Sequence, residues 1–167
     1  MTCRETSCGL EAPRSSLANW RISRRPLLAC FVGLTLGMAA TSLGATECTL
    51  AATGVAFGDY DFLSPSALEG AGTITVHCDA DTSYTITLSP GYGSYEVRQM
   101  KSGEHSLSYN LYTDVPRTIV WGDGTGGTQT VGASVADQAY PVYARAPAGQ
   151  NPYVGTYTDN IIVTLTF

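Results

Sequence analysis

The last nine residues of the chain, Asp159-Asn160-Ile161-Ile162-Val163-Thr164-Leu165-Thr166-Phe167, carry the pattern that decides the fold. Ile161, Val163, Leu165 and Phe167 occupy every second position. Successive side chains of a β-strand point to opposite faces, so this period of two predicts a strand that is buried on one face. Most domains end in a few loosely ordered polar residues, whereas here the pattern continues to a final aromatic residue. The sequence therefore predicts a C-terminal strand and raises the question of what lies beside it.

The same alternation recurs along the chain, and no segment has a clear helical period. Apolar residues alternate in residues 73–78, 84–88, 107–112 and 140–145, and a shorter apolar stretch occupies residues 119–121. Clusters of Gly, Pro, Asn and Asp separate these segments, as at Pro90-Gly91 and in residues 146–152. Short alternating segments bounded by turn residues predict an all-β protein, and specifically a β-sandwich.

Residues 1–45 do not fit this pattern and indicate a secretory signal peptide. Several arginines precede an apolar run at residues 27–40, and small residues follow, which places the cleavage site between residues 40 and 45. A permanent transmembrane helix needs ~20 apolar residues, so export is the better interpretation of this run. The pair Arg24-Arg25 also fits a twin-arginine signal, which exports folded proteins, so the route of export stays open.

Residues 46–167, the predicted mature domain, are acidic. They contain four basic residues against twelve acidic ones, which gives a net charge of −8. Such a surface repels nucleic acids and anionic membranes. We therefore expect no nucleic-acid partner and, once the signal peptide is removed, no transmembrane segment.

Two of the five cysteines, Cys48 and Cys78, lie in the predicted mature domain. Two cysteines in an exported chain predict one disulfide bond. A metal site formed by these cysteines and His77 is the poorer interpretation, because His77 and Cys78 are adjacent and would point to opposite faces of a strand.

No residue pattern indicates catalysis or a cofactor. His105 lies in a polar segment that predicts an exposed turn and lacks the partners of a general base. Residues 122–128 are rich in glycine but contain no lysine and precede no helix, so they predict a tight turn rather than a phosphate-binding loop. Asp59 and Asp61 could bind calcium, but no ring of further oxygen ligands accompanies them. We expect a protein that is not an enzyme and that binds no metal.

Five segments in this order resemble a known family: AGTITVHC (71–78), LSYNLYTD (107–114), RTIVWGDGTGGT (117–128), RAPAGQN (145–151) and GTYTDNIIVTLTF (155–167). The chain is similar to the spore coat protein U domain family, which includes subunits of archaic (Csu-type) chaperone–usher pili. The similarity covers residues 48–167, essentially the whole predicted mature domain.

The resemblance implies an incomplete immunoglobulin-like β-sandwich that lacks its final strand. An open groove would then lie beside the C-terminal strand, and a strand from a periplasmic chaperone would fill it. During assembly at the outer-membrane usher, a strand from another pilin subunit would replace that of the chaperone. Ile161, Val163, Leu165 and Phe167 would face this groove. The implied location is the periplasm in transit and then the cell surface, in a pilus.

The chain departs from this family before Cys48, the first cysteine of the predicted mature domain. Fibre-forming members carry an alternating apolar donor segment of about ten or more residues there, the length that a groove-spanning strand needs. Even cleavage after Ala40 leaves only residues 41–47, with one large apolar side chain, Leu43. We therefore expect a tip or minor subunit that accepts a strand but cannot donate one. The alternatives are a secreted binding or adhesive module and a coat protein outside a fibre.

Overall fold

The computed structural model describes residues 45–167, so all of the predicted signal peptide except its last residue lies outside the described residues. This part of the chain contains eight strands and no helix. Accordingly, it includes no helical segment that is long and apolar enough to cross a bilayer.

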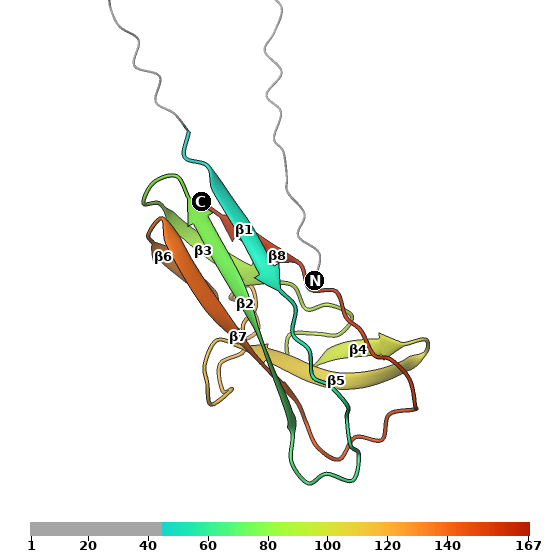
Figure 1. Ribbon diagram of the computed structural model, residues 1–167. Helices are drawn as coiled ribbons and strands as arrows, with labels where there is room; N and C mark the ends of the chain where they lie inside the picture. The colour runs from blue at the N-terminus through green and yellow to red at the C-terminus, as the bar shows by residue number, and fades with distance from the viewer. Residues whose placement is uncertain (1–44) are drawn as a thin grey trace, which may run out of the picture. The chain divides into compact units, whose positions relative to one another are not determined.

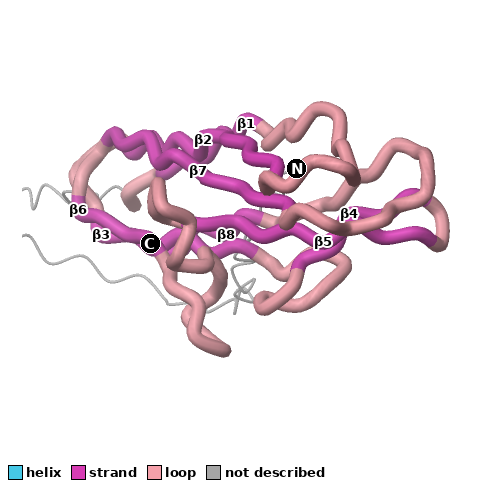
Figure 2. Tube along the Cα trace, turned by 90° about the horizontal axis from the view of Figure 1, so that it is seen from below, coloured by secondary structure: helices cyan, strands magenta, loops and turns pink. Residues whose placement is uncertain are grey.

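The strands form two antiparallel sheets (Figure 1). The larger sheet has five strands in the order β1 (Cys48–Thr53), β2 (Leu68–Cys78), β7 (Asp137–Ala146), β5 (His105–Tyr112) and β4 (Arg98–Ser102). The smaller sheet has three strands in the order β6 (Val131–Ser134), β3 (Ser83–Leu88) and β8 (Val163–Thr166). Figure 2 shows β2 and β7 in one layer, with β3 and β8 in the layer opposite. The predicted all-β sandwich is therefore confirmed.

The core lies between the two sheets and is built from alternate residues of each strand. Ile74, Val76 and Cys78 of β2 are at most 2% exposed, as the period of two predicts. Trp121 fills the centre of this core, and its Nε1 donates a hydrogen bond of 3.2 Å to the Ile86 carbonyl oxygen. The N–H group of this fully buried indole thus has a hydrogen-bond acceptor in the main chain of the smaller sheet.

The C-terminal segment connects both sheets. Thr158 pairs with Lys101 of β4 through two main-chain hydrogen bonds of 2.8 and 3.0 Å. Ile162 then accepts a bond of 2.9 Å from the Ser89 N–H, after which β8 pairs with β3. The predicted strand over residues 161–167 is therefore shorter than expected, because its first part bonds to irregular chain at Ser89.

Two further boundaries differ from the sequence prediction. Residues 119–121 form isolated bridges instead of a strand: Val120 pairs with Tyr112, and Trp121 pairs with Gln129. The predicted strands over residues 73–78 and 140–145 are longer in the structure, since β2 begins at Leu68 and β7 begins at Asp137. The extra residues of β2 include Gly70 and Gly72. Glycine is uncommon in strands, so these two residues obscure the start of β2 in the sequence.

Candidate functional site

The two sheets leave one side of the sandwich open. Among the described residues, β1 pairs only with β2 and β8 pairs only with β3. Residues 54–60, which continue from β1, make no main-chain hydrogen bond to another described main-chain group. The first and last segments of the domain therefore both present an unpaired edge.

A groove lies between these edges, and we define it by the walls that line it: residues 54–62 on the N-terminal side and residues 152–161 on the C-terminal side. It contains a smaller cavity of about 170 Å³ and a larger one of about 480 Å³. Residues 54–57 and 157–161 line the smaller cavity, whereas residues 55–62 and 152–157 line the larger one. Residue numbers rise along one wall while they fall along the other, so the two walls run antiparallel.

Core side chains form the floor of the smaller cavity. Met100, Tyr109, Leu111 and Ile161 line it, and each of these residues is at most 8% exposed. The groove therefore opens directly onto the hydrophobic core. Apolar surface of this kind favours an apolar occupant by about 25 cal/mol for each Å² removed from water.

The N-terminal wall depends on two glycines of β2. A Cβ atom at Gly70 would lie 2.8 Å from Val55 Cγ1, and one at Gly72 would lie 2.7 Å from the Thr53 carbonyl oxygen. Because these positions carry no side chain, the segment after β1 can cross close to β2. The alternation changes phase there, since Leu50 is half-buried within β1 but Val55 and then Phe57 are the half-buried residues beyond it.

A tyrosine fixes the far end of this wall. The Tyr60 hydroxyl donates a hydrogen bond of 2.6 Å to the Pro147 carbonyl oxygen and accepts one of 3.0 Å from the Gln150 N–H. These bonds join the N-terminal wall to the loop that follows β7. Both ends of the segment 54–60 are thereby held, although its own main chain is unpaired.

Hydrogen bonds also hold the C-terminal wall. Asp159 Oδ2 accepts a bond of 2.7 Å from the Tyr109 hydroxyl, and Asp159 Oδ1 accepts one of 3.2 Å from the Tyr92 N–H. Burial and the hydrogen bond to Asp159 raise the pKa of Tyr109, so this hydroxyl stays protonated at physiological pH and donates its hydrogen bond to Asp159. The Tyr157 hydroxyl donates a bond of 2.7 Å to the Tyr153 carbonyl oxygen.

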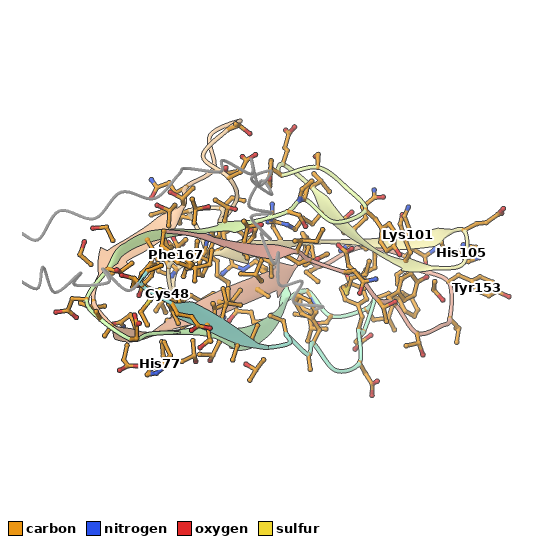
Figure 3. All side chains as sticks on the ribbon, turned by 90° about the horizontal axis from the view of Figure 1, so that it is seen from above. Cys48, His77, Lys101, His105, Tyr153 and Phe167 are labelled. Atoms are coloured by element: carbon orange, nitrogen blue, oxygen red, sulfur yellow. A yellow bond between two sulfur atoms is a disulfide. The ribbon has the colours of Figure 1, made fainter. Side chains whose placement is uncertain are left out.

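The four alternating residues of the C-terminal strand differ in exposure. Ile161 and Val163 are 6% exposed, Leu165 is half-buried and Phe167 is 58% exposed. Ile161 lines the smaller cavity, whereas the other three continue along β8 beyond it. Figure 3 places Phe167 towards the same end of the molecule as Cys48, which begins β1, and away from Tyr153.

The predicted disulfide is confirmed. Cys48 and Cys78 are directly opposite in the β1–β2 register, and their sulfur atoms are joined. Glu47 and Asp79 extend the same pairing, because the Asp79 N–H donates to the Glu47 carbonyl oxygen at 3.0 Å. The disulfide thus fixes β1 to the larger sheet while its other edge stays open.

The other candidate residues from the sequence, which are the two histidines, the two aspartates and the glycine-rich segment, do not form the floor of the groove. His77 and Cys78 point to opposite faces as predicted: Cys78 is buried, and His77 is exposed and pairs with Asp137. His105 begins β5, is exposed, and stacks on Tyr153 with 4.7 Å between ring centroids (Figure 3).

The acidic and glycine-rich candidates have local roles in turns. Asp61 Oδ1 accepts a bond of 2.9 Å from the Leu63 N–H, which caps a turn, and Asp59 is exposed. Three glycines of residues 122–128 have positive φ, which is the conformation that a tight turn demands: Gly124, Gly126 and Gly127. Within residues 45–167, no three His, Cys, Asp or Glu side chains lie close enough together to hold a metal ion.

Residues 34–164 match the Spore Coat Protein U domain, which is most of the chain. The chain belongs to the spore coat protein U domain family. Its relatives in this family include Protein U of Myxococcus xanthus, which is 33% identical over 126 residues, covering 66% of this chain and 70% of that protein. The match begins within the predicted signal peptide, so the boundary at residue 45 stays a prediction.

The fold of this family member is similar to that of a pilus assembly protein. The solved structure is the CsuC–CsuE chaperone–tip adhesion subunit pre-assembly complex from archaic chaperone–usher Csu pili of Acinetobacter baumannii. One chain of it matches with a TM-score of 0.54 and 24% identity over 74% of this chain. This chain spans only 40% of the length of that one, so the likeness concerns the fold of a single domain.

Sequence reasoning missed the N-terminal wall of the groove. The signal was present in Val55 and Phe57, two apolar residues with period-two spacing between Gly54 and Gly58. Their alternation is out of phase with that of β1, so the segment does not extend the β1 pattern. Only the crossing over Gly70 and Gly72 shows why the phase changes.

Proposed function

We propose that the protein is a structural subunit of a chaperone–usher-type pilus, and that a β-strand from a periplasmic chaperone or a neighbouring subunit completes its groove. The observation that carries this proposal is the pair of unpaired edges on either side of an apolar groove that reaches the core. Family membership and the likeness to the Csu pre-assembly complex support it.

A β-strand is the occupant that fits both chemical features of the groove. Its main chain offers donors and acceptors on both sides, which the unpaired groups of β8 and of residues 54–60 require. Its alternate side chains would enter the cavities and cover Met100 and Leu111. A small molecule could fill a cavity, but it would leave the two edges unpaired.

The end of the C-terminal wall and the strand β8 that follows it are the main contact surface in this proposal. Ile161, Val163, Leu165 and Phe167 would meet the apolar side chains of the incoming strand. The exposed fraction rises along these residues to 58% at Phe167, which leaves apolar area of an aromatic ring in water. Exposed apolar area of this kind is expected where a partner strand binds.

The finer proposal is a tip or minor subunit that accepts a strand without donating one. It rests on the predicted cleavage between residues 40 and 45, which leaves too few residues before Cys48 to span a groove. The usher and the export to the cell surface belong to this proposal as well.

A pair of matched variants in β8 tests the proposal. Leu165 is half-buried and packs against the core, whereas neighbouring Thr164 is exposed on the other face of the same strand. In periplasmic co-expression with the chaperone of the same organism, Leu165→Asp should abolish the soluble complex, because a carboxylate in an apolar site is strongly penalised. Thr164→Asp should preserve it. Equal recovery of both complexes would contradict the groove assignment.

The tip assignment is tested by mixing. The purified chaperone-bound protein should accept a donor peptide from another subunit and should form no homopolymer during prolonged incubation. Homopolymers of this chain alone would refute the tip role while leaving the groove assignment intact.

A specific surface feature favours an adhesive module as the second candidate. Four large apolar residues on two loops are more than half exposed: Phe62 at 56%, Leu63 at 76%, Tyr153 at 68% and Val154 at 94%. Replacing Leu63 with serine would reduce attachment to a surface if these loops adhere, and would leave chaperone binding unchanged because Leu63 lines neither cavity of the groove.

A further inference from the structure

Asp123-Gly124 is the only Asp-Gly or Asn-Gly pair in the sequence, and both of its residues are exposed in the glycine-rich turn of residues 122–128. Such a pair is chemically labile, because glycine has no side chain that would keep its main-chain nitrogen away from the aspartate side chain. The glycine nitrogen attacks the carboxyl carbon, a C–N bond forms, and the carboxyl OH leaves with the amide hydrogen as water. Water then cleaves the bond from the aspartate main-chain carbonyl carbon to this nitrogen, which leaves isoaspartate.

This reaction would alter the fold next to the centre of its core. Isoaspartate routes the main chain through the side-chain carbon, so the turn becomes longer by one carbon atom. The turn is closed by two main-chain hydrogen bonds of 2.9 Å, from the Gly122 N–H to the Gln129 carbonyl oxygen and from the Gln129 N–H to the Val120 carbonyl oxygen. These bonds flank Trp121, which is fully buried. A longer turn would therefore disturb the position of the core tryptophan.

A buried threonine binds the nitrogen that would attack. Thr128 is 7% exposed, and its Oγ1 accepts a hydrogen bond of 3.1 Å from the Gly124 N–H. The same hydroxyl donates a bond of 2.8 Å to the Thr125 carbonyl oxygen, which fixes its orientation. A Cβ atom at Gly122 would lie 2.5 Å from Thr128 Oγ1, so the hydroxyl occupies space that only a glycine leaves free. The Gly124 nitrogen must break its bond to Thr128 before it can react.

The carboxylate that would be attacked is held as well. Asp123 Oδ1 accepts hydrogen bonds of 2.6 Å from the Thr125 hydroxyl and 2.9 Å from the Thr125 N–H. The carboxyl carbon must rotate onto the Gly124 nitrogen to react, and both bonds oppose this rotation. They also lower the pKa of Asp123. Since water leaves more readily from the neutral acid than from the carboxylate, a lower pKa slows the reaction at neutral pH.

We propose that Asp123-Gly124 is a latent site of isoaspartate formation, and that the hydroxyl of Thr128 suppresses the reaction by binding the Gly124 N–H. Thr125 supports this protection by holding the carboxylate. The inference does not depend on the pilus function. It matters most for a chain at the proposed cell-surface location, where repair enzymes of the cytoplasm would not reach the altered residue.

The rate of isoaspartate formation in the folded and the unfolded chain tests this inference. The full mature chain is incubated at neutral pH with and without urea. Enzymatic methylation of isoaspartate gives the rate, and tandem mass spectrometry confirms that position 123 carries the modification. The folded wild type should react at least about tenfold more slowly than the chain in urea, which corresponds to about 1.4 kcal/mol in the barrier.

Three threonine variants identify the protecting group. Thr128→Val removes the hydroxyl but keeps the shape, and should raise the rate of the folded protein about fivefold, which corresponds to roughly 1 kcal/mol, the typical contribution of one hydrogen bond. Thr128→Ser keeps the hydroxyl and should keep the wild-type rate. Thr130→Val is the matched control, because exposed Thr130 approaches the position of a Gly124 Cβ atom only with its methyl carbon, at 3.6 Å. The unfolded fraction of each variant, measured by urea titration, is used to subtract the contribution of the unfolded chain.

Asp123→Asn keeps the inference testable if Thr128→Val fails to fold. The amide forms the same succinimide with loss of ammonia and carries no charge, so its rate reports on the hold on the Gly124 nitrogen without the effect of the carboxylate pKa. It should react more slowly in the folded chain than in urea, and equal rates would overturn the inference. The inference would also fail if the folded and unfolded wild type reacted equally fast, or if Thr128→Val reacted no faster than Thr130→Val.

Discussion

Asn110 Oδ1 accepts a hydrogen bond of 2.6 Å from Nη1 of Arg98, and both side chains are buried in the core. The other guanidinium donors reach the carbonyl oxygens of Ser89 and Trp121, at 3.0 Å and 2.7 Å from Nη2. Among the described residues, no carboxylate forms an ion pair with Arg98. Burial lowers the pKa of Arg98 because it disfavours the charged guanidinium group. The carbonyl oxygens of Ser89 and Trp121 and the amide of Asn110 offset this cost by accepting its hydrogen bonds.

Replacing Arg98 with lysine should destabilise the domain strongly. Lysine keeps the charge but cannot reach Ser89, Asn110 and Trp121 together, because it lacks the planar fork of the guanidinium group. Leaving buried acceptors unpaired should cost roughly 2–4 kcal/mol. Thermal unfolding of the wild type and the variant, each with the same excess of a donor peptide from another subunit, measures this loss. As the control, Arg145→Lys in a partly exposed ion pair with Glu69 should cost less than about 1 kcal/mol.

The disulfide should stabilise the domain by constraining its unfolded state. Its cysteines are 30 residues apart in sequence, and closing a loop of this length contributes about 3.5 kcal/mol in the chain-entropy model. The double variant Cys48→Ala, Cys78→Ala should therefore unfold at a lower temperature. It should also expose β1 to proteolysis within Cys48–Thr53, because β1 pairs on one side only. Intact-mass measurement that finds two free thiols in the secreted wild type would contradict this account.

The exposed pair of His77 and Asp137 should make stability depend on pH. The hydrogen bond and the charge of Asp137 raise the pKa of His77 above its ordinary value of 6.5, and Asp79 adds to the effect. The stabilisation is therefore complete below about pH 6.5 and is lost as the pH rises through the raised pKa of the folded state. The difference in Tm between wild type and His77→Gln should be largest near pH 5.5 and should shrink as the pH rises through the raised pKa of His77. A difference that is constant across this range would contradict the assignment, and His105→Gln serves as the control for a histidine outside the pair.

Sequence patterns predict the strands of this fold where burial and hydrophobicity coincide. In β3, Tyr84, Ile86 and Leu88 are all buried and apolar, so their period is visible. In β4, the corresponding buried positions hold Arg98 and Met100, and the charged residue conceals the period. The partners of Arg98 come from three separate segments of the chain, which no local pattern can reveal.

The two walls of the groove also differ in how far the sequence predicts them. The C-terminal wall lies beside a strand whose alternation is plain in the sequence. The N-terminal wall is a segment without main-chain partners, positioned by Tyr60 and by the space over Gly70 and Gly72. Contacts of this kind join residues that are far apart in sequence. The spacing of Val55 and Phe57 marks the segment, but only the structure shows where it lies.

The antiparallel walls give the groove no intrinsic preference between the two directions of an inserted strand. Whichever way the strand points, it runs parallel to one wall and antiparallel to the other. Direction must therefore be decided by side chains, and the unequal cavities along the groove supply the asymmetry that this requires. A sequence and its reversal would present their large residues to opposite ends of the groove. The polarity of the incoming strand, and with it the orientation in which a partner molecule is joined, would then be encoded in the order of a few residues.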